Sequence, residues 1–260
     1  MTPDPGDRLI FLHIPKTAGV NIRELLSRQY HHLPTFIRGS PDHQMLFRMR
    51  PRDREAYRVV GGHYRFGLHL FFDSPSRYMT FLRDPLERVI SHYAYIRWQS
   101  LHAWHERVNA ANFSLEQWVK LGTADAFDNL QVRRLTSRSD EEMPFRQTTR
   151  QMLDEAKRIL EERVDFLGVT ERYEESIRLF ARQLDWREPV TVERLNASPN
   201  RQAAASLPPS TRAAILDHNA LDIELYAFAV KLLERRLASS ETRRPTDQNL
   251  GANRAPYETA

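Results

Sequence analysis

The chain has 260 residues, of which 41% are hydrophobic and 10% aromatic, so it can bury a sizeable core and is not an intrinsically disordered chain. Its 38 basic and 34 acidic residues leave a net charge of +4, a surplus too small to drive nucleic-acid binding. The absence of cysteine excludes disulfides, thiolate zinc sites and a cysteine nucleophile, and it suits a reducing cytoplasm. No signal peptide or membrane span is visible, so we expect a soluble cytoplasmic protein.

The first apolar run, at residues 9–14, predicts a strand that leads through a short loop into a helix. The loop carries Lys16, Thr17 and Gly19, and a helical pattern follows at residues 21–26. This order directs free backbone N–H groups and the positive end of a helix at one anion. Lys16 adds a mobile charge at the same place. The segment therefore predicts a site for a nucleotide phosphate.

Strand-like and helix-like patterns alternate along the rest of the chain. Further strands are predicted at residues 57–60, 78–82 and 165–169, and helices at 84–98, 115–121, 126–135, 149–163 and 173–184, with a long amphipathic stretch at 210–237. Such alternation predicts an α/β fold in which a mainly parallel central sheet is flanked by helices, giving three layers. Residues 38–54 are rich in arginine and lack periodicity, so we expect a long loop there. We expect a single domain over residues 1–237 and a disordered tail over residues 238–260.

The opening loop differs from the P-loop of nucleoside triphosphatases, G-x-x-x-x-G-K-[ST]. That motif requires glycines where this chain has Ile10 and Pro15, so ATP or GTP hydrolysis loses most of its support. Here the glycine follows the lysine, in Pro-Lys-Thr-Ala-Gly19. This segment resembles the 5′-phosphosulfate loop of sulfotransferases that use 3′-phosphoadenosine 5′-phosphosulfate (PAPS), especially their carbohydrate branch. The resemblance implies a P-loop-like fold and PAPS as the donor.

A second motif, Thr80-Phe-Leu-Arg-Asp-Pro-Leu-Glu-Arg-Val-Ile-Ser-His-Tyr93, predicts a strand followed by a helix. Its Asp-Pro pair is typical of a helix start, which puts Arg83 at the strand end and Ser91 in the second helical turn. A guanidinium and a hydroxyl so placed can bind one phosphate. The segment resembles the 3′-phosphate motif of the same family. The alternative is that Arg83 only neutralises Asp84 or Glu87.

A histidine lies between these two motifs, in Val59-Val-Gly-Gly-His-Tyr-Arg-Phe66. The segment resembles the Gly-His-x-x-Phe segment of uronyl 2-O-sulfotransferases, heparan sulfate 2-O-sulfotransferase among them, and this resemblance implies that His63 is the catalytic base. An imidazole with an ordinary pKa near 6.5 can accept a hydroxyl proton near neutral pH. His13, His69 and His92 are weaker candidates, and we expect His13 to support the loop.

The resemblance covers residues 8–237, with less detail outside these motifs. Segments at 129–134 and 166–171 are similar to parts of the family, although we expect Asn129 and Gln131 to maintain the fold. Leu195-Asn-Ala-Ser-Pro-Asn-Arg201 resembles a C-terminal loop that contacts the nucleotide. The donor site implied by the resemblance consists of Lys16, Thr17, Ala18, Gly19, Val20, Asn21, Arg83, Ser91, Ser198 and Arg201, with His63 and Lys16 as the catalytic residues.

One departure from the family's pattern follows the loop glycine, where hydroxyl residues are common. Val20 offers only its backbone N–H, so one side-chain contact to the phosphosulfate is expected to be missing. Asn21 can donate from its amide, or it can cap the helix together with Glu24.

Together the motifs predict in-line transfer of a sulfuryl group from PAPS to a hydroxyl acceptor, in the first place a carbohydrate. His63 would remove the hydroxyl proton, and Lys16 would stabilise charge on the departing phosphate. The arginines at residues 48–54 either meet an anionic glycan or are balanced by Asp53 and Glu55 in solvent. No metal-ligand spacing is present, so we expect no metal. The alternatives are a nucleotide kinase or NTPase with a non-Walker loop and a non-catalytic phosphonucleotide-binding module, while no motif points to nucleic acid.

Overall fold

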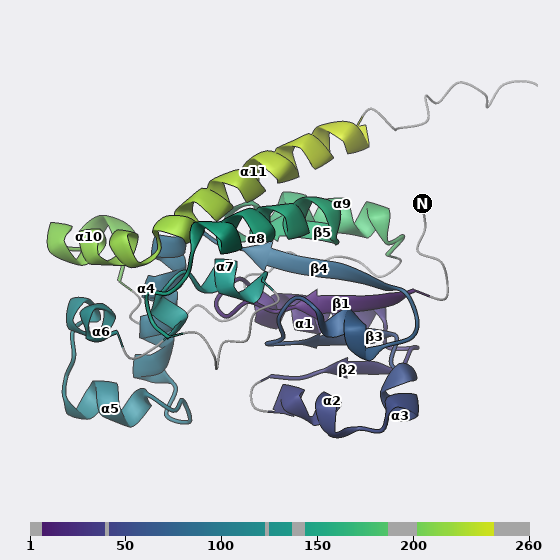
Figure 1. Cartoon of the computed structure of the whole chain (residues 1–260), viewed down its shortest axis with the longest axis horizontal. Helices are drawn as coiled ribbons and strands as arrows, with labels where there is room; N and C mark the ends of the chain where they lie inside the picture. Colours follow the sequence, from purple (N-terminus) through teal and green to yellow (C-terminus); the bar gives the residue numbers. More distant parts are fainter. Residues whose placement is uncertain (1–6, 40–41, 123–124, 137–143, 187–201, 242–260) are drawn as a thin grey trace, which may run out of the picture.

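The computed structural model describes residues 7–39, 42–122, 125–136, 144–186 and 202–241. Within these residues five parallel strands form one sheet: β1 (Arg8–Leu12), β2 (Thr35–Ile37), β3 (Val59–Gly62), β4 (Ser76–Leu82) and β5 (Val164–Val169), in the order β2-β3-β1-β4-β5 (Figure 1). The predicted α/β fold with a parallel sheet is confirmed. Only β2 was not predicted, because three residues are too few to give a strand pattern.

Helices flank this sheet on both faces. They are α1 (Gly19–Gln29), α2 (Met45–Arg48), α3 (Pro51–Glu55), α4 (Pro85–Trp98), α5 (His105–Ala110), α6 (Leu115–Leu121), α7 (Leu130–Arg134), α8 (Arg150–Glu162), α9 (Tyr173–Gln183), α10 (Pro209–His218) and α11 (Ala220–Glu241), with 3₁₀ turns η1 (Asp42–Gln44), η2 (Leu68–Phe71), η3 (Asp125–Phe127), η4 (Thr170–Arg172) and η5 (Ala204–Ser206). None of the described helices is long and apolar enough to cross a membrane.

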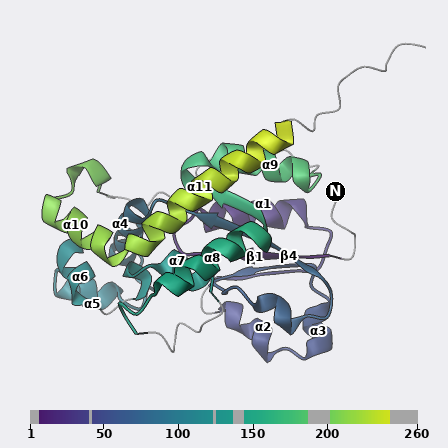
Figure 2. The same cartoon turned by 45° about the horizontal axis from the view of Figure 1, so that its top comes forward.

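The core has a layer on each face of the sheet because successive strand residues point to opposite sides. Ile10 and Leu12 of β1 pack in one core with α7, α8 and α11, whereas Phe11 packs in the other with α1 and α9. Figure 2 shows α11 running diagonally between α8 and α9. A third apolar cluster joins α4, α5, α6 and α10, which lie together at one end of the molecule (Figure 1).

Two sequence predictions of local structure were wrong, and a third segment is divided in a way that its pattern did not indicate. Residues 38–54 are not one long loop, since Leu46 is fully buried and Pro51 starts a helix, so η1, α2 and α3 form there. The helix expected at 126–135 is divided into η3 and α7 by Asn129, whose φ is 45°. The stretch expected at 210–237 is two helices separated by Asn219, and the second reaches Glu241. Residues 242–260 of the expected tail lie outside the described residues.

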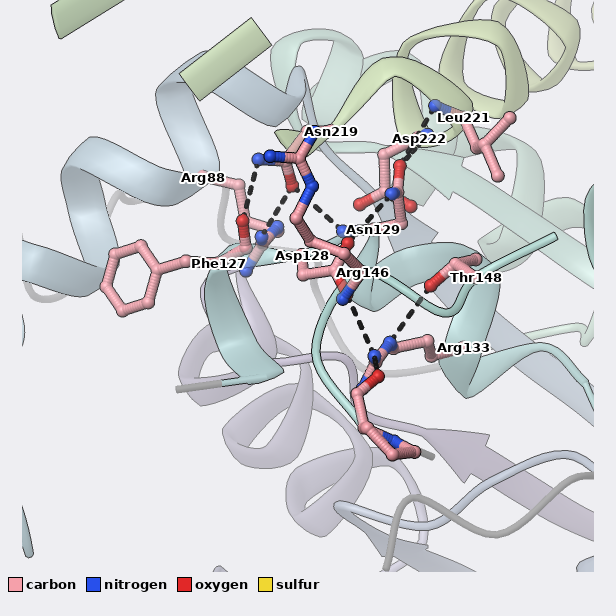
Figure 3. A network of polar contacts seen from close by, with 11 residues as sticks. Arg88, Phe127, Asp128, Asn129, Arg133, Arg146, Thr148, Asn219, Leu221 and Asp222 are labelled. Carbon is pink, nitrogen blue, oxygen red and sulfur yellow. Dashed lines mark hydrogen bonds and ion pairs between the residues drawn. The ribbon is translucent and has the colours of Figure 1, made fainter. Parts of the chain in front are cut away.

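Helices α7 and α11 cap each other's first turns, and Figure 3 shows one of the two caps, in which Asn129 meets Leu221 and Asp222 of α11. The carboxylate of Asp222 in α11 accepts hydrogen bonds from the backbone N–H groups of Gln131 and Val132 in α7, at 3.0 and 2.8 Å. In return, Asn129 Oδ1 accepts from the N–H groups of Leu221 and Asp222, at 2.9 and 3.0 Å. This exchange satisfies buried amides of both helices and fixes α7 relative to the sheet.

Candidate active site

The predicted motifs converge at the carboxyl edge of the sheet because β3, β1 and β4 are adjacent and parallel (Figure 1). His63 follows β3, the loop with Lys16 follows β1, and Arg83 follows β4. Open parallel sheets place ligands at this edge. The topology therefore brings together the phosphate loop, the arginine motif and the histidine, which are well separated in the sequence.

The loop between β1 and α1 has an unusual backbone conformation. Lys16 and Ala18 have left-handed φ values of 72° and 64°. The Thr17 hydroxyl is buried and donates to the carbonyl of Ile14 at 2.8 Å, so the side chain stabilises the loop. We expect Thr17 to contact a ligand through its backbone N–H. Helix α1 has no side-chain cap and no acidic residue in its first turn. Its positive end is thus left to an external anion.

Gly19 is required by the ring of His13. A Cβ atom at this position would lie 1.6 Å from His13 Nε2. His13 is nearly fully buried, and its ring stacks on that of His63 with the centroids 4.3 Å apart. The expectation that His13 supports the loop is confirmed, and the same ring links the loop to the candidate base.

The Lys16 ammonium points toward α4. Its Nζ lies 4.1 Å from the centre of the Tyr95 ring, which is cation–π distance. Tyr95 follows Ser91 by one helical turn, so the two side chains share a face of α4. Ser91 is buried in the second turn of that helix, as its motif predicts.

Arg83 connects the second motif to the first. Its Nη1 donates to the carbonyl of Lys16 at 3.1 Å, while Nη2 lies 3.6 Å from Glu87 and Nε 3.8 Å from Glu171. The ion pair with Glu87 is the alternative that the sequence left open, and it exists alongside the loop contact. Asp84 instead caps α4, accepting from the N–H of Glu87 at 3.0 Å. Arg83 thus lies between a phosphate loop and two carboxylates.

Gln131 holds the backbone of Arg83 in place. Its side-chain amide donates to the Arg83 carbonyl and accepts from the Arg83 N–H, both at 2.9 Å. Asn129 caps α11, as described above. The expectation that both residues maintain the fold is confirmed, although Gln131 does so at the site itself.

The tautomer of His63 is fixed by its surroundings. His63 Nδ1 donates to the carbonyl of His13 at 2.9 Å, since a carbonyl can only accept, and Nε2 keeps a lone pair. Burial lowers the pKa of His63 to about 4, and the positive charges of Arg134 and Arg23 add to the effect of burial. The imidazole is therefore neutral over the physiological range and presents a proton acceptor.

His69 and His92, the other two histidines considered as bases, contact aromatic side chains of the fold. His69 Nδ1 lies 2.8 Å from the Tyr78 hydroxyl. His92 is nearly fully buried and stacks on Phe127 at 5.3 Å. Among the described residues, no group of three histidines and carboxylates could hold a metal ion.

Several residues differ from what the sequence indicated or escaped it. Asn21 lies within the first turn of α1, and Ala18 has the N-cap position, so Asn21 is not the helix cap. Val20 is exposed beside the loop. Ser198 and Arg201 lie outside the described residues. Tyr95 carried no sequence signal, because its role depends on how α4 packs beside the loop.

Comparison with known proteins gives two similarities. The model of a family described as the sulfotransferase family matches residues 1–229. Among curated proteins, the chain is similar to heparan-sulfate 6-O-sulfotransferase 2 of Gallus gallus, with 26% identity over an alignment 275 positions long that covers 88% of this chain and 68% of that protein.

Proposed function

This chain belongs to the sulfotransferase family, and from that premise we propose that it transfers a sulfuryl group from PAPS to a carbohydrate hydroxyl. The observation that carries the proposal is the contact between the two nucleotide motifs: Arg83 donates to the carbonyl of Lys16 at the edge where His63 also lies. The glycan acceptor is supported by the similarity to an enzyme named for heparan sulfate.

The residues around the loop fit a donor with two anionic groups. The first turn of α1 contains no acidic residue, and Lys16 adds a cation, which suits a 5′-phosphosulfate. Arg83 and Ser91 lie beside this loop and suit a 3′-phosphate. Bound there, the donor supplies the sulfuryl group and a phosphate leaving group. Lys16 is then placed to stabilise the negative charge that develops as the leaving group departs.

His63 has the properties that an acceptor hydroxyl requires of a base. Its Nδ1 proton is held by the His13 carbonyl, so Nε2 is the atom that takes the hydroxyl proton as the acceptor oxygen attacks sulfur. Its lowered pKa makes it a weak base in the free protein. We expect the anionic donor to raise that pKa, because negative charge near the ring favours the imidazolium.

The charges near the base favour an anionic acceptor. Arg23 and Arg134 both act on His13 and His63, and Arg134 also donates to the His63 carbonyl at 3.1 Å. These cations lie at the point where the reacting hydroxyl would arrive. A sulfated or carboxylated sugar chain complements them, whereas a neutral alcohol does not.

The direct test is transfer of labelled sulfate from PAPS to a panel of glycans and small alcohols. We expect turnover with heparan-sulfate fragments. The position of the label has to be read from the product, because the segment around His63 resembles 2-O-sulfotransferases while the similar chicken protein is a 6-O-sulfotransferase. Lys16→Ala should reduce turnover by about two to three orders of magnitude, as loss of a transition-state donor does. Lys120→Ala, on distant α6, is the matched control.

The alternatives give different results in the same experiments. A preference for ATP over 3′-phosphoadenosine 5′-phosphate (PAP) in calorimetry would favour a kinase or NTPase and contradict the proposal. PAP binding without turnover on any acceptor would indicate a non-catalytic module. Near-native turnover by His63→Ala would show that another group removes the proton.

A further inference from the structure

We propose that an exposed aromatic ledge beside the active site, formed by Met45, Phe47, Leu70 and Phe71, is the surface on which the sugar chain of an anionic acceptor lies. The proposal rests on the proposed function. It extends that function by assigning a binding surface to the sugar units of the acceptor that are distant from the reacting hydroxyl. The ledge belongs to α2 and η2, and α2 lies at the β2 side of the sheet (Figure 1).

The ledge exposes more apolar surface than folding requires. Met45, Phe47, Leu70 and Phe71 are 51%, 44%, 78% and 46% exposed. The rings of Phe47 and Phe71 lie edge to face with their centroids 5.0 Å apart, which joins the two elements into one patch. The intervening Leu46 is fully buried and anchors α2, so the outward position of its neighbours is fixed. Exposed apolar patches of this kind mark binding surfaces.

A continuous series of rings leads from the ledge to the candidate base. Phe47 contacts Tyr64 at 5.8 Å between ring centroids, Tyr64 contacts His43 at 5.3 Å, and His43 contacts His63 at 6.0 Å. The Tyr64 hydroxyl donates to the His43 carbonyl at 2.7 Å, which holds η1 against the end of β3. The ledge is therefore linked to the candidate active site by a series of ring contacts that ends at His63, directly after β3.

Charge selects a glycan as the occupant. Arg54 Nε donates to the Phe71 carbonyl at 2.9 Å, and its guanidinium lies 5.5 Å from the centre of the Phe71 ring. Arg134 provides a cation at the other end of the series, bonded to the His63 carbonyl. Aromatic faces flanked by fixed guanidinium groups suit pyranose rings that carry sulfate or carboxylate groups. An apolar protein partner would gain nothing from these cations.

The experiment compares a long and a short acceptor. For Phe47→Ala and Phe71→Ala we expect the KM for a heparan-sulfate octasaccharide to rise by about five- to tenfold, as loss of an aromatic contact does. The KM for a disaccharide, the affinity for PAP and turnover at saturation should remain at the wild-type level. Phe47→Tyr should restore the octasaccharide KM, because it keeps the ring. Leu121→Ala, which removes an exposed apolar side chain from α6, is the matched control.

Direct binding of the octasaccharide, measured by calorimetry, separates this proposal from the proposed function. If the wild-type protein fails to bind PAP, the proposed function fails, and the ledge is still tested by octasaccharide affinity. An unchanged octasaccharide KM in Phe47→Ala, or an equal rise for the disaccharide, would overturn the ledge proposal. A change of sedimentation from dimer to monomer in the same variant would also overturn it, because the ledge would then be a contact between copies. Should Phe47→Ala not fold, Phe47→Leu keeps the apolar volume and removes only the ring.

Discussion

The imidazole of His63 lies among positive charges, with Arg23 and Arg134 near it, and no carboxylate of the described residues is bonded to its ring. This environment differs from that of a histidine base held by an acidic side chain, which has a raised pKa. Here the orienting group is a neutral backbone carbonyl, which fixes the tautomer and raises the pKa of His63 by less than burial lowers it. Under the proposed function we therefore expect the charge of the donor to raise the pKa of the ring, so that the strength of the base would depend on nucleotide binding.

We predict that the pKa of His63 is about 4 in the free protein and rises when PAP binds. Burial and the nearby cations disfavour the imidazolium, and the phosphates of PAP offset those cations. NMR titration of labelled histidines with and without PAP measures both values, and His63→Gln assigns the resonance. A free-protein pKa near 6.5, or no shift on PAP binding, would contradict the prediction.

Arg83 lies between its loop contact and two carboxylates, which predicts opposite effects for two substitutions. Arg83→Ala should weaken PAP binding by about ten- to a hundredfold, because hydrogen bonds to charged groups are lost. Glu87→Gln should tighten PAP binding a few fold, since the guanidinium loses a competing partner 3.6 Å away. Calorimetry measures both. The control is Glu174→Gln, which removes the carboxylate that pairs with exposed Arg178 and should leave PAP affinity unchanged.

Among the single residues of the candidate site, those within local motifs could be predicted from the sequence. Lys16, Arg83 and His63 each follow a strand, and parallel strands bring their carboxyl ends to one edge, so their meeting could be inferred. Tyr95 and Gln131 could not be inferred, because their contacts depend on helix packing and on segments distant in the sequence. The hydrogen bond from the Thr17 hydroxyl to the Ile14 carbonyl inside the loop is likewise a contact that the motif did not indicate.

Among the secondary-structure elements, α7 is short but carries much of the site's support. It contributes Gln131, which holds Arg83, and Arg134, which reaches the His63 carbonyl. A helix of five residues has little stability of its own. The reciprocal caps therefore couple α11 to the candidate active site, because loss of either cap leaves buried amides without an acceptor.

Asn129→Gly should destabilise the protein by about 1–3 kcal/mol, because buried backbone N–H groups lose their acceptor. Glycine tolerates the φ of 45° at this position, so the substitution keeps the backbone conformation and removes the side-chain hydrogen bonds to the N–H groups of Leu221 and Asp222 and to the carboxylate of Asp128. Chemical denaturation measures the change in the free energy of unfolding. Asn112→Gly is the matched control, because Asn112 has a φ of 46° in an exposed loop. Equal stability of the two variants would contradict the role of the cap.

Asn129 and Asn219 explain which helix boundaries the sequence could not predict. The helix expected at 126–135 runs across residue 129, and the amphipathic stretch at 210–237 runs across residue 219, so the sequence pattern gives no sign of either break. The backbone turns there because buried Asn side chains bond to neighbouring helices, which is a tertiary effect. Elements with clear local signals, such as the Asp-Pro start of α4 and the Ser114 cap of α6, agree with their predicted ranges.

For the molecule as a whole, the three-layer arrangement buries histidines as well as apolar residues. His13 and His92 are nearly fully buried, one between the loop and His63 and the other against Phe127. Burial above all lowers the pKa of both well below 6.5, and nearby cations and histidines add to this lowering. The folded protein therefore keeps both rings neutral under conditions in which the unfolded chain binds protons.

We predict that stability falls as the pH decreases from about 6.5 toward 4. Because the folded-state pKa values of His13 and His92 lie below the unfolded value of 6.5, the unfolded state binds more protons in this window, and each ring costs about 1.4 kcal/mol per pH unit. Above pH 6.5 the contribution is constant. Glu55 does not account for this change. Burial raises its pKa, but hydrogen bonds from Ser74 and Arg8 help to lower it to about 2. The stabilisation from Glu55 is therefore lost only below pH 4.5, the ordinary pKa of the carboxyl group.

Thermal and chemical unfolding at pH 7.5, 6.0 and 5.0 measure this slope. His92→Phe should keep the stacking on Phe127 and reduce the slope, because the proton-binding difference of His92 disappears while those of the other histidines with lowered pKa values remain. The slope is the informative quantity, since the substitution also changes the absolute stability at pH 7.5. A variant with the wild-type slope would show that His92 takes up a proton in the folded state, and that the space between α4 and η3 admits water.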